Sequence, residues 1–566
     1  MESLEKHNQG YKIINRKEIS MRTPVLTIIL ILFCFLYFTS DWIDFRNPNE
    51  FSRFYLTQAL IDRQTFVIDE SIATRDTQDK SYYQGHYYTD KAPGTSFLAA
   101  PAYLAVRLLE TYTGFAPGEK TVLYIVRLVS VSIPSALFLF LLYSLWGRIT
   151  SSYTLRRALL IAYGLGTPVW AYSTLFFGHQ LAGICLFLAF ILIFEAGTSP
   201  EKRRLLFQGG FFCGLAFFIE YPTILISFLL LLYAIIRCNK SGPRGRVRVR
   251  EKAPVIFFFL AGLAIPLAAT CYYHWKCFGS ITAFPYYFVT DPVCAVEHSQ
   301  GLSGVTFPLS WGELSGQLSA LIQLLFSPFR GLFFYSPFLL LGVAGIIKMI
   351  RDPKWKWEGW LFGSLAVVYF LFYSAFVNWE GGWSMGPRHL VPLIPFLVTA
   401  ILYLLSGSGP EIRKKIAWGL VPLVVVSIAF NFIGTVVFPH LPVIFKNPLY
   451  EFSWRFLRRG IFGPTVGRWF GLRGWMELVP LFIIMGILLT VLLRDLSNLY
   501  SSRRMVRIGF LLLCLAIAVG MLGLGLSLSS PRALGLSSDE PYRPAATREL
   551  IGSFLGKTPG ESLVIR

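Results

Sequence analysis

The amino-acid sequence predicts an all-α, polytopic membrane protein with about 13 transmembrane helices and a first outer loop that carries short amphipathic helices. Three observations lead to this fold class. The 566-residue chain is 54% hydrophobic with a mean hydropathy of +0.54, which is too apolar for a soluble protein of this size. Apolar runs long enough to cross a bilayer recur along it. Aromatic residues make up 16% of the chain, as expected for helices with interfacial aromatic belts.

Each predicted span is an apolar run close to the roughly 20 residues that a bilayer-crossing helix needs. The first span follows a polar, basic tail, and no small-residue cleavage site comes after it, so we interpret it as a retained membrane anchor. In chain order the predicted spans cover 23–40, 122–146, 156–175, 178–197, 205–220, 222–237, 254–273, 332–350, 359–377, 389–406, 416–438, 476–493 and 507–528.

Short basic loops give the predicted orientation. With the N-terminus in the cytoplasm, every predicted inner loop carries Lys or Arg, which satisfies the positive-inside rule. The sequence therefore predicts a multi-pass protein of the cell inner (plasma) membrane, with a cytoplasmic N-terminus and an extracytoplasmic site. The predicted inner loops are 147–157, 198–204, 237–252, 351–358, 407–415 and 494–507.

On this topology the chain divides into four parts. They are a cytoplasmic tail (1–22), a transmembrane catalytic module (23–440) with outer loops 41–121 and 274–331, a segment with one more outer loop and further helices (441–528), and an outer tail (529–566).

One basic segment, residues 446–473, falls on the outer side and interleaves arginines with aromatic residues. An interfacial amphipathic helix that touches anionic headgroups of membrane lipids accounts for this pattern, and part of a site for an anionic lipid is the alternative. The net charge of +20 is assigned to membrane topology. Because no nucleic-acid-binding motif occurs, no nucleic-acid partner is expected.

Polar residues predicted on the outer side come from distant parts of the chain. Nine carboxylates lie between Asp41 and Asp90. Ionisable groups beside apolar spans are costly, so we expect the outer ones to line a single cavity. A solvated loop face, a helix cap or packing is the alternative reading of each, and Asp76 is expected on a solvated face. The candidate cavity residues are Asp90, His179, Glu220 and Glu380.

Three basic residues on the same side are candidates to bind a phosphate group on a lipid carrier. Lys91 precedes the Pro93-Gly94 turn, Arg388 follows a glycine-rich run, and Arg53 lies in the first outer loop. Glycine lets a backbone approach a ligand closely, and the arginine fork suits phosphate oxygens. For Lys91, a side chain that reaches along apolar surface to the membrane interface is an equal alternative.

Four segments resemble the GT-C superfamily of polyprenyl-phosphate-dependent glycosyltransferases, especially bacterial members similar to protein O-mannosyltransferases and to the aminoarabinose transferase of lipid A. The resemblance covers most of 20–440. It implies transfer of a hexosyl or pentosyl group from a polyprenyl-phosphate donor to a glycan, lipid or protein acceptor, with Lys91, Arg388 and Arg53 at the donor phosphate. The segments are Pro48–Arg53, Lys91–Gly94, Ser327–Leu332 and Gly381–Arg388.

The resemblance also implies a carboxylate base in the first outer loop. The superfamily often has an Asp-Glu pair there, and this sequence has Asn49-Glu50 instead. The identity of the base is therefore open among Glu50, Asp44 and Asp41. Such a base must come within hydrogen-bond reach of the acceptor hydroxyl.

Cofactors and rival functions remain open at this point. Some members of the superfamily use a divalent metal ion near the phosphate; His86, His179 and His274 are available, but no ligand spacing decides for a metal. No other cofactor is expected. The rivals are a transporter or flippase of a lipid-linked glycan, and a non-catalytic scaffold. Ionisable residues concentrate at the outer end with few at mid-span, which favours the transferase over transport.

Overall fold

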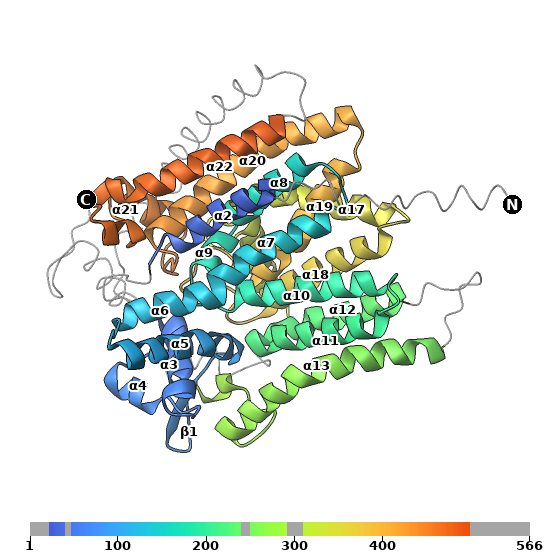
Figure 1. The fold of residues 1–566 in the computed structure, drawn as a ribbon. Helices are drawn as coiled ribbons and strands as arrows, with labels where there is room; N and C mark the ends of the chain where they lie inside the picture. Colours follow the sequence, from blue (N-terminus) through green and yellow to red (C-terminus); the bar gives the residue numbers. More distant parts are fainter. Residues whose placement is uncertain (1–21, 40–46, 239–248, 291–309, 498–566) are drawn as a thin grey trace.

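The protein is a bundle of long apolar helices with a layer of shorter segments packed on one end (Figure 1). The computed structural model describes residues 22–39, 47–238, 249–290 and 310–497. Within these ranges eight helices are long and apolar enough to cross a membrane, and Pro24–Leu36 is a shorter apolar helix. The prediction of a helical, polytopic membrane protein is confirmed, whereas the count of 13 spans is not.

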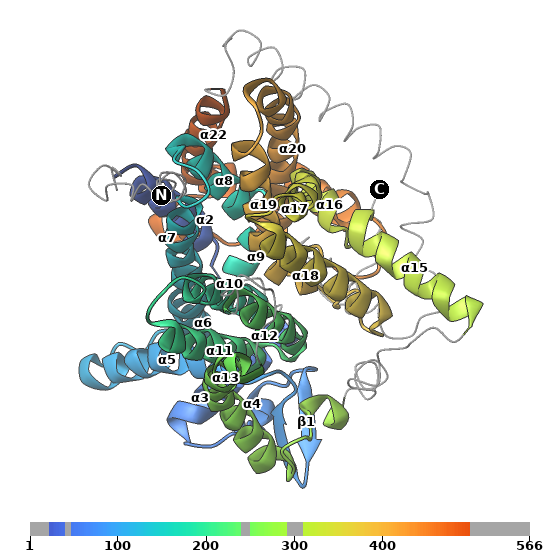
Figure 2. The same cartoon turned by 90° about the vertical axis from the view of Figure 1, so that its right-hand side faces the viewer.

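The helices before the second outer loop are α2 (Arg22–Leu36), α3 (Pro48–Asp62), α4 (Asp69–Thr74), α5 (Gly94–Thr113), α6 (Glu119–Arg127), α7 (Ile133–Trp146), α8 (Tyr153–Leu165), α9 (Val169–Ser173), α10 (His179–Ala196), α11 (Lys202–Ile219), α12 (Ile224–Cys238) and α13 (Val249–Phe278). Helix α15 (Trp311–Phe326) lies within that loop, and those after it are α16 (Leu332–Tyr335), α17 (Leu340–Arg351), α18 (Lys356–Ala375), α19 (Ile394–Ser406), α20 (Pro410–Val437), α21 (Arg455–Arg458) and α22 (Val479–Ser497). Figure 2 looks along the bundle and shows α15 at its edge.

Two predicted spans are interrupted by proline. The predicted helix 156–175 is divided into α8 and α9 before Pro168, and the predicted helix 332–350 is divided into α16 and α17 by a 3-10 turn over Pro337–Leu339. Proline lacks a backbone donor and disfavours a helical residue before it, so each apolar run bends at that point. The predicted span 507–528 lies outside the described residues.

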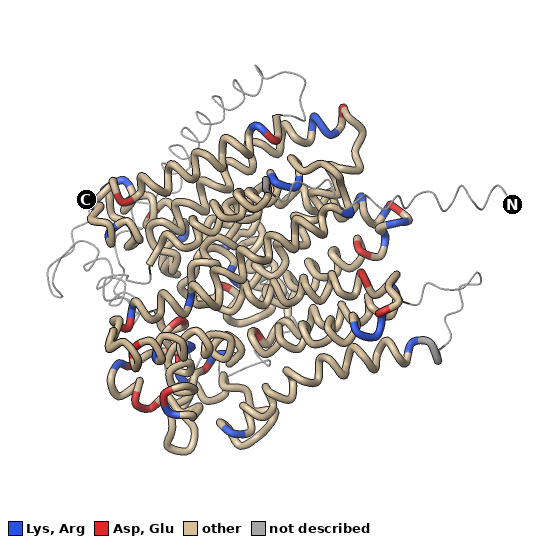
Figure 3. The backbone as a smooth tube through the Cα atoms, viewed as in Figure 1, with Lys and Arg blue, Asp and Glu red and all other residues tan. Residues whose placement is uncertain are grey.

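The loops predicted to be cytoplasmic meet at one end of the bundle, and Figure 3 shows charged residues gathered at the two ends. The outer candidates that the structure describes lie together at the opposite end. This grouping agrees with the predicted topology, while the membrane side that each end faces stays a prediction. Pairs that join the inner loops are Arg148–Glu195 (2.5 Å), Arg157–Asp495 (2.6 Å) and Arg237–Glu358 (3.8 Å).

The first outer loop differs from the prediction in two respects. Helix α3, predicted as amphipathic, is buried from Asn49 to Thr57, because α5 and the loops beside it cover it on several sides. The described structure also contains an antiparallel hairpin of β1 (Lys80–Tyr83) and β2 (His86–Thr89). Its turn residues Gln84 and Gly85 have φ of 48° and 91°, as a two-residue hairpin turn requires. Tyr and Thr are common in strands, so the Tyr and Thr residues that flank the turn were the sequence feature that could have predicted this hairpin.

Candidate active site

The segment Phe176–His179, between α9 and α10, lies at the centre of the candidate site. The Phe176 N–H donates to Glu50 Oε1 at 2.6 Å. The guanidinium carbons of Arg53 and Arg388 each lie 5.9 Å from the centroid of the Phe177 ring. This one segment therefore brings together residues of the first outer loop and of the glycine-rich loop before α19.

Glu50 lies near the start of α3, where its carboxylate accepts one backbone N–H and faces one imidazole. Asn47 caps this helix, since its side-chain oxygen accepts from the backbone N–H of Asn49 and Glu50. The Asn47 amide nitrogen must then donate to His440 Nδ1, 2.8 Å away. His440 consequently carries its proton on Nε2, which lies 3.2 Å from Glu50 Oε2. Asn47 thus determines the tautomer of His440, in which the protonated Nε2 faces Glu50.

Arg53 and Glu220 form a buried ion pair. Arg53 Nη2 donates to Glu220 Oε1 at 3.0 Å, and Arg53 Nη1 donates to the side-chain oxygen of Asn49 one turn earlier. The Arg53 and Glu220 side chains are 2% and 13% exposed. His179 Nδ1 lies 3.6 Å from the same Glu220 oxygen. Burial raises the pKa of Glu220, although Arg53 and Arg388 act in the opposite direction.

Two glycines let the first outer loop and the Phe176–His179 segment approach the end of α11. A Cβ atom on Gly178 would lie 2.5 Å from Glu220 Oε1, and one on Gly94 would lie 2.5 Å from the Phe218 carbonyl oxygen. Gly94 ends the Lys91–Gly94 segment that the sequence singled out. Its physical role is close backbone packing against α11.

Lys91 is enclosed by acidic partners. Its ammonium lies 2.8 Å from Asp79 Oδ2 and 2.7 Å from Asp90 Oδ2. Asp90 also accepts from the Ser52 hydroxyl on α3, at 3.4 Å. Burial opposes the charge on Lys91, but Asp79 and Asp90 outweigh it and hold the pKa of Lys91 above its usual range. The positive charge of Lys91 is therefore compensated within the protein.

Arg388 follows a glycine-rich loop that a buried arginine holds in place. Gly381 and Gly382 have φ of 73° and 60°, a conformation that glycine adopts without strain. Arg330 is fully buried and donates to the carbonyl oxygens of Glu380 at 2.7 Å and Gly382 at 2.6 Å. The Ser327–Leu332 segment thus has a structural role, because its Arg330 holds the loop that precedes Arg388 in place.

The Arg388 guanidinium differs from the other two candidate phosphate ligands. Among the residues that the structure describes, it forms no ion pair and no side-chain hydrogen bond, although it acts electrostatically on Glu220, and its Nε is buried. Arg53 and Lys91 are paired with Glu220 and with Asp79 and Asp90. Arg388 is therefore the cation of this cluster whose donors are available to an anionic ligand.

Most of the residues predicted for the outer site belong to this cluster. Glu380 contributes its backbone carbonyl to Arg330, and Asp41 and Asp44 lie outside the described residues. The exposed Asp76 pairs with Lys80, as expected for a solvated face. The predicted residues that the fold brings together are Glu50, Arg53, Asp90, Lys91, His179, Glu220 and Arg388.

Two contributors were missed from the sequence. Phe177 looks like any aromatic of an apolar run. His440 follows α20 directly, and a lone histidine at the end of an apolar span was the only signal for it.

The residues present do not fit a divalent metal ion. No group of three His, Cys, Asp or Glu residues that could hold one occurs in the described ranges. The position between Asp79 and Asp90 is filled by the Lys91 ammonium. His86 pairs with Asp69 at 2.8 Å, and His274 Nε2 accepts from the Tyr221 hydroxyl at 2.8 Å.

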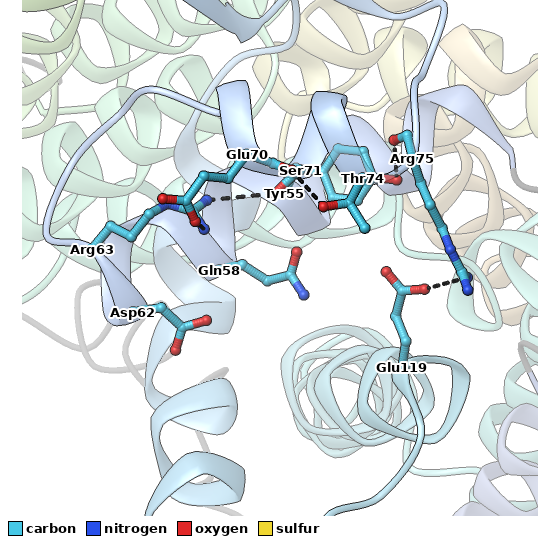
Figure 4. Close-up of a pocket in the computed structure, with 9 residues that line it drawn as sticks. All are labelled: Tyr55, Gln58, Asp62, Arg63, Glu70, Ser71, Thr74, Arg75 and Glu119. Carbon is cyan, nitrogen blue, oxygen red and sulfur yellow. Dashed lines mark hydrogen bonds and ion pairs between the residues drawn. The ribbon is translucent and has the colours of Figure 1, made fainter.

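A separate polar cavity of about 340 Å³ lies beside another face of α3 (Figure 4). Ion pairs Arg63–Glu70 and Arg75–Glu119 lie among its walls. None of the predicted site residues lines it, so it is distinct from the cluster around Phe177. Its lining residues are Tyr55, Gln58, Asp62, Arg63, Glu70, Ser71, Thr74, Arg75 and Glu119.

No protein-family model matches the chain, and no curated protein matches it in sequence. Among solved structures the chain is similar to ArnT from Cupriavidus metallidurans bound to undecaprenyl phosphate, with a TM-score of 0.47 and 16% identity over 89% of this chain and 77% of that one. Apo ArnT gives a TM-score of 0.45 and 15% identity, over 89% and 76% of the two chains.

The chain is also similar to an oligosaccharyltransferase of Archaeoglobus fulgidus in complex with Zn and sulfate. The TM-score is 0.38 and the identity 11%, over 72% of this chain and 52% of that one.

Proposed function

We propose that the protein is an integral-membrane glycosyltransferase that moves a sugar from a polyprenyl-phosphate donor to an acceptor hydroxyl at the extracytoplasmic face. The apolar bundle suits a lipid-linked donor, and the polar layer at one end suits a hydroxyl-bearing acceptor. The observation that carries the proposal is the Arg388 guanidinium, which makes no ion pair and no hydrogen bond with the described residues and lies within electrostatic reach of Glu220.

Arg388 is proposed to bind the donor phosphate. An arginine fork matches phosphate oxygens, and a preorganised cation in a site shielded from water stabilises charge that develops on a leaving group. The support for choosing Arg388 first is that Lys91 and Arg53 would have to give up buried carboxylate partners to reach a phosphate. Lys91 and Arg53 are proposed to keep the carboxylates of the site in position.

Glu50 is proposed as the base, because its polar neighbours, the Phe176 N–H and the His440 imidazole, are neutral, whereas Glu220 already neutralises Arg53. Asp44 and Asp41 stay as alternatives. Glu50 takes the proton of the acceptor hydroxyl while the acceptor oxygen bonds to the anomeric carbon. The bond from that carbon to the phosphate oxygen breaks, and its electron pair leaves with the polyprenyl phosphate. A base of this kind contributes about 10²–10⁴-fold.

The experiment uses the full chain in lipid nanodiscs with a radiolabelled polyprenyl-phosphate sugar and separates donor from product by extraction. Arg388→Ala is expected to weaken binding of undecaprenyl phosphate itself, measured without any sugar. Glu50→Gln is expected to leave that binding unchanged and to reduce transfer by at least about 10²-fold. Asp76→Asn, which changes an exposed carboxylate, is the matched control and should leave both measurements unchanged.

The result that would overturn the proposal is full transfer by both variants. A transporter or flippase gives a different outcome: labelled donor crosses the membrane of a proteoliposome, and no acceptor, whether glycan, lipid or protein, ever becomes labelled. If the Glu50→Gln variant kept full transfer and the Glu220→Gln variant lost transfer, Glu220 would be assigned as the base instead of Glu50.

A further inference from the structure

An exposed surface of arginines and aromatic side chains lies at the same end of the bundle as the candidate site. It is built by α21, by the 3-10 turns Val466–Phe470 and Gly474–Leu478, and by the loop between those turns. We call it the arginine–aromatic surface, and its residues are Arg458, Arg459, Trp469, Phe470, Arg473 and Trp475.

No described residue compensates the positive charge of this surface. The two carboxylates of segment 446–478 are both engaged: Glu451 accepts from the Asn447 N–H at 3.0 Å, and Glu477 pairs with Arg468 at 2.6 Å. Both carboxylates are buried. Among the described residues, none of the three arginines of the surface has an ion-pair or hydrogen-bond partner, although all three are exposed. Three positive charges are thus offered outward.

The aromatic side chains of the surface are unusually exposed. Phe470 is 79% exposed, Trp469 57% and Trp475 49%. Exposed apolar side chains grouped in this way mark a contact with another molecule or with a membrane. The candidate span Gly474–Ser497 begins inside the surface, so its aromatic residues stand where a helix enters the bilayer. Tryptophan and tyrosine are enriched at that level of membrane proteins.

The surface is fixed to the bundle. The Val466 N–H donates to the Tyr37 carbonyl at 2.9 Å, and Trp469 packs edge-on against Tyr124 at a centroid distance of 5.4 Å. Tyr37 lies just after α2, and Tyr124 lies in α6. The arginines and aromatic side chains are therefore presented by a folded scaffold that reaches back to the first span.

We propose that the arginine–aromatic surface binds the headgroups of anionic phospholipids in the leaflet at this end of the bundle. Its aromatic rings lie at the interface because a span starts among them, and its unpaired guanidinium groups match the headgroup phosphates. A soluble protein partner would not require the surface to coincide with the start of a span. The inference goes beyond the proposed function and does not depend on it.

The test is hydrogen exchange of segment 455–478, measured on the full chain in nanodiscs of phosphatidylglycerol and of phosphatidylcholine. We expect slower exchange in phosphatidylglycerol. The Arg458→Gln/Arg459→Gln/Arg473→Gln variant should lose this difference, and the matching triple lysine variant should keep most of it, because the charge remains. The Arg351→Gln/Lys354→Gln/Lys356→Gln variant, changed at the opposite end of the bundle, should keep the difference in segment 455–478.

Equal exchange of this segment in the two lipids would overturn the proposal. It would also be overturned if the glutamine variant retained the full difference. Protection that appears only after a soluble protein is added, in both lipids alike, would assign the surface to a protein partner and equally overturn it. Melting temperatures of all variants in phosphatidylcholine show whether a lost difference reflects a folding defect.

Discussion

The Glu50 carboxylate and the His440 imidazole lie 3.2 Å apart, although one follows the first span and the other follows α20. The Asn47 amide leaves His440 with its proton on the nitrogen that faces Glu50. We propose that His440 is a positioning residue for Glu50, because the nitrogen that Asn47 leaves protonated faces the carboxylate. This relationship joins the first outer loop to the segment that leads to the arginine–aromatic surface.

Replacing His440 should reduce turnover rather than donor affinity. His440→Phe keeps an aromatic ring but removes the nitrogen that lies 3.2 Å from the Glu50 carboxylate. Loss of this polar contact costs at most as much as a hydrogen bond to a charged group, about 1.5–3 kcal/mol, which corresponds to about 10- to 100-fold in rate. We expect kcat to fall by this factor while KM for the donor stays the same. His86→Phe, on the exposed hairpin, is the control. A change confined to KM would contradict the positioning role.

Gly178 should tolerate no side chain. A Cβ atom there would lie 2.5 Å from Glu220 Oε1 and 2.9 Å from Ile219 Cγ2. Overpacking of this kind costs about 1–3 kcal/mol, so Gly178→Ala should lower the melting temperature and disturb the Arg53–Glu220 pair. Gly118→Ala is the matched control, because nothing lies within 4 Å of its Cβ position and its φ is −61°. Equal melting temperatures for the two variants would disprove the close approach.

Lys91→Met should destabilise the protein in a pH-dependent way. It leaves Asp79 and Asp90 buried without their cation, which costs about 3–5 kcal/mol. Protonation relieves the repulsion between the two carboxylates, so the deficit in melting temperature should shrink between about pH 7.5 and about pH 5. The raised pKa of Lys91 keeps it charged over this range in the unmodified protein. Adding Asp79→Asn should restore part of the stability, and a deficit independent of pH would argue against this arrangement.

Glu220 should give stability a slope with pH. Burial raises its pKa, so the folded protein holds this proton more tightly than the unfolded chain does. The free energy of unfolding therefore falls as the pH rises from the ordinary value of 4.5 through the raised pKa. Glu220→Gln cannot titrate, yet it can still accept from Arg53. Its melting temperature in nanodiscs should fall less over this range than that of the unmodified protein or of Glu70→Gln, and parallel curves would refute the prediction.

The sequence predicted which polar residues lie together at one end of the bundle more successfully than it predicted the contacts among them. Lys91, Arg53 and Arg388 were equivalent as basic residues beside apolar spans. The structure separates them, because Asp79 and Glu220 come from other parts of the chain and neutralise two of the three. The hairpin 80–89 was not predicted because polar residues surround it in the sequence. The burial of α3 was not predicted because the spacing of its apolar residues is typical of an amphipathic helix.

Hydropathy and loop charge are local properties, and they determined the helical membrane class, most of the spans and the grouping of the polar candidates at one end. Charge compensation and hydrogen-bond pairing are not local. Three features depend on which distant segments meet. They are the Asn47–His440–Glu50 contacts, the packing of Gly178 on Glu220, and the lack of an ion pair or hydrogen bond at the Arg388 side chain in the described residues. Tertiary structure decided them because a buried charge is stable only where the fold places a partner beside it. The order of residues along the chain does not give the distance between a charge and its partner in space.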